Sequence, residues 1–252
     1  MSKLVTDRGR SSAVVIEAVG THANDLNTRL RARLERYLEG AEVMPDIALF
    51  VKIIGRHMGR AADELHAAHR AHEAELSDDV APRLERDDAE VELRDLVIMF
   101  RNGISAALGD GVLRAHSIYD SAPSDTRGLL DYAKGLRIAL VEPALAPTAR
   151  SRGGLIVNRA AMALELEPVI ARLDAAVKIV TREASELAVT QTAKDTAMSA
   201  NDTVFKNSAN VMEALLILAD RKDLADRVRP SPRRPGVVEN EVAVVVDPTA
   251  GT

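Results

Sequence analysis

Histidine and acidic side chains gather between residues 57 and 75, where their types and spacing suit metal coordination. His66, His69 and His72 recur every three residues, so they lie near one another on one side of a helix. On bundle helices a Glu-x-x-His pair builds a carboxylate-bridged di-metal site, and the match in this chain is Asp63-x-x-His66. The candidate metal ligands are therefore Asp63, His66, His69, His72 and Glu73.

A di-metal site of this kind needs ligands from several facing helices, and the chain offers no second Glu-x-x-His pair. A polar, solvated helix end that is rich in histidine explains the segment more simply. A third interpretation is a pH-responsive contact, since imidazoles on one face become charged together below a pH of about 6.5. We therefore predict no metal site, and the five residues above remain the candidates for one.

Motifs of other chemistry are missing. The chain has no cysteine, which excludes disulfides, thiolate metal sites and cysteine nucleophiles. It contains no nucleophile elbow, no Ser-His-Asp order and no phosphate-binding glycine loop. We expect neither an enzyme nor a cofactor, and interpret the chain as a structural or interaction protein.

Composition favours helices packed on helices. Hydrophobic residues make up 46% of the 252 residues, but aromatic residues only 2%, so alanine and aliphatic side chains must fill the core. The net charge of −5 lacks the basic excess of a nucleic-acid-binding protein, so we expect no nucleic acid partner. Neither a secretory signal nor an apolar run of about 18 residues is present, which predicts a cytoplasmic, non-membrane protein. The alanine- and arginine-rich usage resembles that of bacteria.

Apolar residues at three- and four-residue steps predict the positions of the helices. The first helix runs from about residue 12 to 38. The second begins near Pro45 and carries a strict heptad repeat, which favours coiled-coil-like packing. Its repeat consists of Ile47, Val51, Ile54, Met58, Ala61, Leu65, Ala68 and His72. A third helix after Pro82 presents Leu93, Val97, Phe100, Ile104 and Ala107. A shorter helix follows, capped by Ser124 or Asp125, with Leu129, Ala133, Leu136 and Leu140 in phase.

The residues from 169 to 229 contain no Gly or Pro and keep one helical phase. They predict either one helix of about 90 Å, at about 1.5 Å per residue, or two helices that meet at a turn. We favour a turn at residues 199–202, because Ser, Asn and Asp bond to their own backbone and a monomeric bundle must fold back. The polar content of residues 190–210 indicates either an exposed tip or a subunit contact.

The C-terminal residues differ from the rest of the chain. Residues 227–236 alternate arginine with proline and predict an extended linker. The valine-rich run after it is the only strand-like segment, and it has no sister strand. Such a segment is typical of a peptide that docks on the sheet edge of a partner protein. The predicted contact residues are Val242, Val244, Val245 and Val246.

These patterns together predict an all-α protein, an elongated antiparallel bundle of four to six helices with a disordered C-terminal tail. Residues 1–11 form a flexible N-terminus, 12–226 the bundle and 227–252 the linker and tail. Within the bundle, 45–108 and 154–226 are candidate hairpins joined by 109–153. We expect a self-associating scaffold, a homo-oligomer whose tail docks on a protein partner. The alternatives are a metal storage or redox protein that uses the histidine-rich helix, and a peripheral membrane-binding protein.

Overall fold

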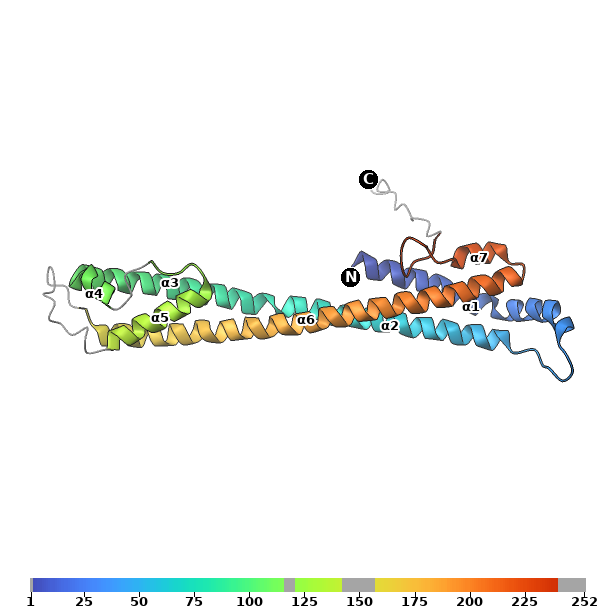
Figure 1. The fold of residues 1–252 in the computed structure, drawn as a ribbon, viewed down its shortest axis with the longest axis horizontal. Helices are drawn as coiled ribbons and strands as arrows, with labels where there is room; N and C mark the ends of the chain where they lie inside the picture. The colour runs from blue at the N-terminus through green and yellow to red at the C-terminus, as the bar shows by residue number, and fades with distance from the viewer. Residues whose placement is uncertain (1, 116–120, 142–156, 240–252) are drawn as a thin grey trace, which may run out of the picture. The chain divides into compact units, whose positions relative to one another are not determined.

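The chain is all-α, as predicted, wherever its structure is described. The computed structural model describes residues 2–115, 121–141 and 157–239, and their regular elements are helices (Figure 1). These are α1 (Lys3–Leu34), the 3₁₀ helix η1 (Glu35–Tyr37), α2 (Ile47–Asp78), α3 (Val80–Leu108), α4 (Asp110–Ala115), α5 (Thr126–Val141), α6 (Arg159–Leu218) and α7 (Lys222–Val228). None of the described helices is long and apolar enough to cross a membrane.

The helices form two compact units. Unit 1 combines the residues up to Ala74 with those from Ala188 onward, and unit 2 consists of Glu75–Leu187. Two long helices, α2 and α6, contribute residues to both units. Each unit has its own apolar core, because each brings together helices whose buried faces repeat every three or four residues.

The core of unit 1 is built by α1, α2, the C-terminal part of α6, and α7. The predicted heptad face of α2 lies largely in this core, with Val51, Met58 and Leu65 almost fully buried. The apolar cluster consists of Val15, Val19, Ala23, Leu26, Leu30, Ala48, Val51, Met58, Phe205, Ala209, Met212, Leu216, Ala219, Leu224, Ala225, Val228 and Val238.

The core of unit 2 is built by α3, α4, α5 and the N-terminal part of α6. The predicted faces of α3 and α5 are both buried. Ser124 and Asp125 were the two predicted caps of α5, and the cap is Asp125. Its Oδ1 accepts a hydrogen bond of 2.7 Å from the Gly128 amide. The apolar cluster consists of Ala89, Leu93, Val97, Phe100, Ile104, Leu113, Leu129, Leu130, Ala133, Leu136, Ala139, Leu140, Ala163, Leu166, Ile170 and Leu173.

The predicted flexible N-terminus over residues 1–11 is wrong. Helix α1 begins at Lys3, and both Val5 and Arg8 are buried in it. The face that carries Val15 and Val19 continues toward the N-terminus through Ser12, Arg8 and Val5 at three- and four-residue steps. Helix α1 therefore continues toward the N-terminus for as long as this face is buried.

The predicted turn at residues 199–202 is also wrong, because α6 is one continuous helix through this region. One polar residue of this region, Asp202, has its partner on the neighbouring helix. The Arg8 guanidinium of α1 donates to both carboxylate oxygens of Asp202, at 2.7 and 2.9 Å. Asn201 is buried beside it, with 2% of its surface exposed. The polar content that indicated a turn therefore belongs to a helix–helix contact within unit 1.

Neither predicted hairpin forms as expected. Asp79, between α2 and α3, keeps helical backbone angles of φ −69° and ψ −16°, so residues 45–108 do not fold back at this point. Pro82 lacks the amide that would bond to residue 78, which interrupts the helix without turning it. Residues 154–226 contain the uninterrupted α6 instead of two long helices. The described part of 109–153 contains α4 and α5.

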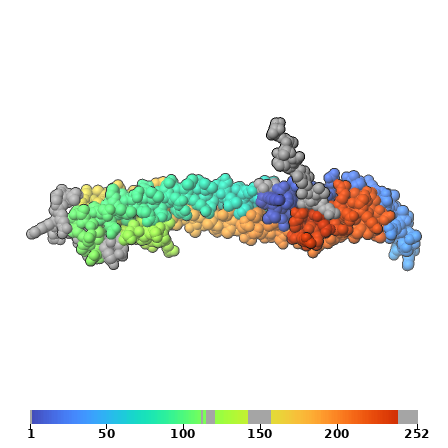
Figure 2. Space-filling model, turned by 90° about the horizontal axis from the view of Figure 1, so that it is seen from above, coloured from blue at the N-terminus to red at the C-terminus, as the bar shows by residue number. Residues whose placement is uncertain are grey.

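The predicted extended linker is a loop that returns to unit 1. Helix α7 continues to Val228, and beyond it the Ser231 amide donates to the Val237 carbonyl at 2.7 Å. Val237 and Val238 are buried, and the Val238 amide donates to Ser11 Oγ of α1. Figure 2 shows these C-terminal segments in red beside the dark blue start of α1. Val242, Val244, Val245 and Val246 lie outside the described residues, so their docking stays a prediction.

Candidate functional site

The histidine-rich face of α2 packs against the helices of unit 1. His69 is 3% exposed, and its Nε2 accepts a hydrogen bond of 3.0 Å from the Ser2 amide. The same nitrogen lies 3.2 Å from Glu73 Oε1. His72 is buried one turn further along, with its Nδ1 at 3.2 Å from Thr190 Oγ1 of α6. These imidazoles therefore engage α1 and α6 as packing and hydrogen-bonding groups.

Burial lowers the pKa of His69, since desolvation disfavours the charged imidazolium. The Glu73 carboxylate opposes this effect, while the amino terminus, Lys194 and His72 lower the pKa further. A neutral His69 accepts the Ser2 hydrogen bond through one nitrogen. A protonated Nε2 could not accept this hydrogen bond.

Two other candidate metal ligands on α2, His66 and Asp63, have different surroundings. His66 lies against Gly9 of α1, where a Cβ on Gly9 would come within 2.9 Å of the imidazole ring. Asp63 is exposed and borders a groove described below. Within the described residues, no group of three or more metal-ligand atoms within 4.8 Å of one another includes Asp63, His66, His69, His72 or Glu73.

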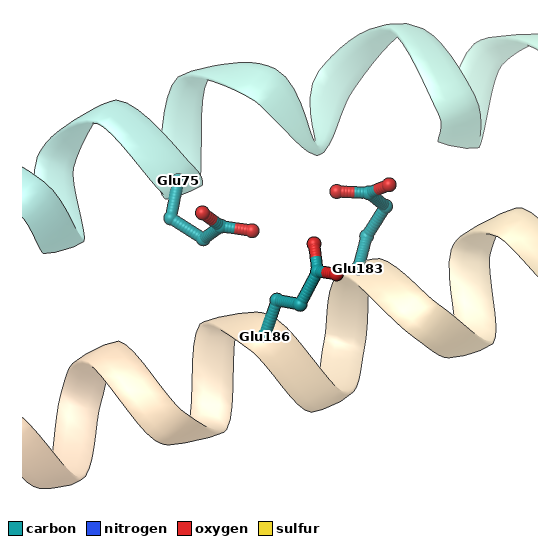
Figure 3. Close-up of side chains that lie close together, drawn as sticks. All are labelled: Glu75, Glu183 and Glu186. Atoms are coloured by element: carbon teal, nitrogen blue, oxygen red, sulfur yellow. The ribbon is translucent and has the colours of Figure 1, made fainter.

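Three carboxylates do come together in unit 2. Glu75 of α2 and both Glu183 and Glu186 of α6 place one oxygen each within 4.8 Å of one another (Figure 3). Glu183 is buried, Glu75 is half-buried and Glu186 is exposed. Oxygen ligands of this kind are those that Ca²⁺ or Mg²⁺ takes, and they also suit a shared proton.

The electrostatics of this carboxylate cluster are unfavourable at neutral pH. Burial first, and then the charges of Glu186 and Glu183, raise the pKa of Glu75. Arg182 offsets part of the repulsion, because its guanidinium donates to Glu183 at 2.7 Å. The sequence could not reveal this cluster, because Glu75 is far from the other two in the chain and only tertiary packing joins them.

A groove of about 1140 Å³ follows the α1–α2 contact in unit 1. Its apolar lining includes Ile16 of α1 with Leu49 and Ile53 of α2, and the last two are 51% and 49% exposed. Three glycines also line it, and a Cβ on Gly20 would meet nothing within 4 Å. The full lining is Ile16, Val19, Gly20, Leu49, Lys52, Ile53, Gly55, Arg56, His57, Gly59, Arg60 and Asp63.

Basic side chains border this groove. Lys52, Arg56 and Arg60 recur at four-residue steps along α2, and all three are exposed. No ion pair within the described part of the chain involves any of them. Asp63 supplies a single carboxylate at one end. The groove therefore offers an open apolar floor with an uncompensated positive border.

An aliphatic stripe lies exposed on α3 in unit 2. Leu84, Val91 and Ile98 recur every seven residues, and Val80 precedes them by one helical turn. Their exposed fractions are 59%, 59%, 40% and 56% in that order. The buried face of α3 is formed by other residues, and Asp88 and Asp95 alternate with the members of this stripe on the same side of the helix, so the stripe is a single row of aliphatic side chains. Sequence reasoning noted only the buried face, although the heptad spacing of the exposed one was a usable signal.

No model of a protein family matches the chain, and no curated protein and no solved structure matches it either.

Proposed function

We propose that this chain is a self-associating helical scaffold protein of the cytoplasm, with coiled-coil-like contacts between copies and a C-terminal tail that docks on a partner protein. The observation that carries the proposal is the exposed aliphatic stripe of α3. Heptad-spaced aliphatic residues on an exposed helix face are what a partner helix buries in a coiled-coil contact. Scattered exposed aliphatic residues are ordinary, whereas an aligned row of them marks an interaction surface.

The energy available from this stripe sets the expected affinity. Burying the exposed half of each aliphatic side chain contributes about 1 kcal/mol, so the four together contribute about 4 kcal/mol. Association costs at least about 4 kcal/mol in lost translational and rotational freedom. The stripe by itself therefore supports only weak association, and contacts around it must supply the rest. Self-association is expected at micromolar or higher concentration.

Sedimentation velocity across the micromolar to millimolar range tests self-association. The wild-type chain is expected to shift from monomer to larger species as its concentration rises. The double variant Leu84→Glu/Val91→Glu is expected to remain monomeric, because each carboxylate would lose its hydration in the contact. Leu164→Glu on α6, which replaces a 71% exposed aliphatic residue outside the stripe, is the matched control and should associate as wild type does. A wild-type chain that stays monomeric throughout contradicts the proposal.

The tail is tested separately. The chain ending at residue 239 is expected to self-associate as the full chain does, and to lose any partner that crosslinks to the full chain through residues 242–246. Replacing Val242, Val244, Val245 and Val246 by serine should give the same loss, since strand addition needs apolar side chains for its pockets. Crosslinks that persist in both variants would assign partner binding to the helices instead.

A further inference from the structure

The groove of unit 1 and the stripe of unit 2 are complementary in length. The groove follows α2 from Leu49 to Asp63, and the heptad-spaced part of the stripe follows α3 from Leu84 to Ile98, with Val80 one turn before it. Both intervals correspond to about 21 Å of helix at about 1.5 Å per residue. The glycines in the groove add no side chains that would keep an entering helix at a distance. The groove therefore runs along α2 for the same length as Leu84, Val91 and Ile98 run along α3.

Their charges are complementary as well. Asp88 and Asp95 lie on the side of α3 that carries the stripe, three or four residues from its members, and they are exposed, seven residues apart, and in no ion pair within the described chain. Other carboxylates on this helix are already paired, with Glu85 and Glu92 both held by Arg172. Unpaired aspartates therefore accompany the stripe, whereas unpaired Lys52, Arg56 and Arg60 border the groove.

From this double complementarity we propose that the groove of one copy binds the α3 stripe of a second copy of the chain. The proposal deepens the self-association proposed above and rests on it. It makes the interface heterologous, with different surfaces on the two copies. Pairing like surfaces is disfavoured, because two grooves would bring basic borders together and two stripes would bring unpaired aspartates together.

A complementation experiment tests this assignment. The groove variant is Leu49→Glu/Ile53→Glu and the stripe variant is Leu84→Glu/Val91→Glu, and all four positions are exposed. Each variant alone is expected to sediment as a monomer, at least tenfold weaker in association than wild type. An equimolar mixture is expected to give a dimer and nothing larger, because one intact groove and one intact stripe remain. Far-ultraviolet circular dichroism should show the wild-type helix content in both variants.

Several outcomes would overturn the assignment. A groove variant that associates as wild type does shows that the groove is not used. A mixture that stays monomeric, while wild type associates, excludes groove-to-stripe pairing and leaves self-association standing. Loss of association in the chain ending at residue 239, which keeps both the groove and the stripe, would show that groove-to-stripe pairing is not sufficient and would contradict the assignment. A monomeric wild type rejects the proposed function itself.

Charge exchange is a second measurement that does not depend on the aliphatic substitutions. Lys52→Glu/Arg56→Glu is expected to weaken self-association about tenfold at low salt, and Asp88→Lys/Asp95→Lys to do the same. Mixing the two variants should restore binding between them, because the opposite charges again face each other. Equal weakness of the mixture and of the separate variants would contradict the proposed pairing.

Discussion

The two parts of α6 bury their faces in different ways. In unit 2 its buried residues begin with the aliphatic Ala163, Leu166, Ile170, Leu173 and Ala176. In unit 1 the same helix buries Asn201 and Ser208 among apolar residues, and Asp202 pairs with Arg8. Aliphatic contacts tolerate a shift of one helix along another, whereas a charge pair has one position in which both partners are satisfied. Unit 1 therefore has a mostly buried ion pair that sets the register of α1 against α6, whereas the ion pairs that join α6 to α3 in unit 2, from Arg172 to Glu85 and Glu92, are largely exposed.

The largest effect is expected from breaking the polar anchor of unit 1. Asp202→Ala leaves the Arg8 guanidinium, whose side chain is 10% exposed, without its carboxylate. Removing one partner of a buried ion pair costs about 3–5 kcal/mol of unfolding free energy. Urea denaturation should show this loss, and hydrogen exchange should place it in unit 1. The double variant Arg8→Met/Asp202→Leu should recover most of it, and failure to recover would mean that the charge itself is not the cause.

A smaller effect is expected from a cavity in unit 2. Leu173 is fully buried in the aliphatic core, so Leu173→Ala is expected to cost about 3 kcal/mol. Urea denaturation checks the loss, and hydrogen exchange should rise in α3 and α5 but not in α1. Leu164→Ala on the same helix, at a 71% exposed position, serves as the control and should change stability little. Equal losses in the two variants would contradict the assignment of the core.

Acid should weaken unit 1 through His69. Its folded-state pKa is lowered from the ordinary value of 6.5, so its contribution to stability is present above 6.5 and is lost as the pH falls through the folded-state pKa. His69→Gln keeps a hydrogen-bonding side chain but cannot be protonated in this range. Urea denaturation well above and well below pH 6.5 should show a smaller pH dependence in the variant. An unchanged pH dependence would show that other groups dominate.

The smallest effect, with the opposite sign, is expected in unit 2 from Glu75. Its pKa is raised in the folded state above the ordinary value of 4.5, so the folded chain binds this proton more tightly than the unfolded chain. Stability therefore falls as the pH rises through the folded-state pKa. Glu75→Gln should stabilise the chain at neutral pH and lose that advantage below pH 4.5. Thermal unfolding at both pH values measures this, and a destabilised variant at neutral pH would contradict the predicted repulsion.

The positions and buried faces of several helices could be predicted from the sequence. The apolar faces of α3 and α5 were predicted residue by residue, and Asp125 was one of two predicted caps, because these features depend on neighbours within a few residues. The errors share one cause. The flexible N-terminus over residues 1–11, the turn at 199–202 and the extended linker were predicted from the sequence of each segment alone, whereas contacts with residues distant in the chain hold these segments.

The candidate sites show the same division. The histidines of α2 suggested metal ligands because they share a face, but α1 and α6 use His69 and His72 for packing and hydrogen bonds instead. The carboxylate cluster joins Glu75 to Glu183 and Glu186, and no spacing in the sequence relates them. The groove depends on how α1 packs against α2, and the apolar periodicity of the sequence does not predict that packing.

The sequence by itself determined that the chain is helical and which face of most helices is apolar, because a period near 3.6 residues is a local property. Local sequence predicted the role of a polar cap such as Asp125, but the roles of the polar residues that contact distant helices depend on the tertiary structure. Asp202 could cap a turn or hold a partner, and only the arrival of Arg8, separated from it by 194 positions in the chain, made it an anchor. Helical periodicity in the sequence predicts which face of a helix is buried. It does not predict which helix packs against that face, because this depends on the tertiary structure.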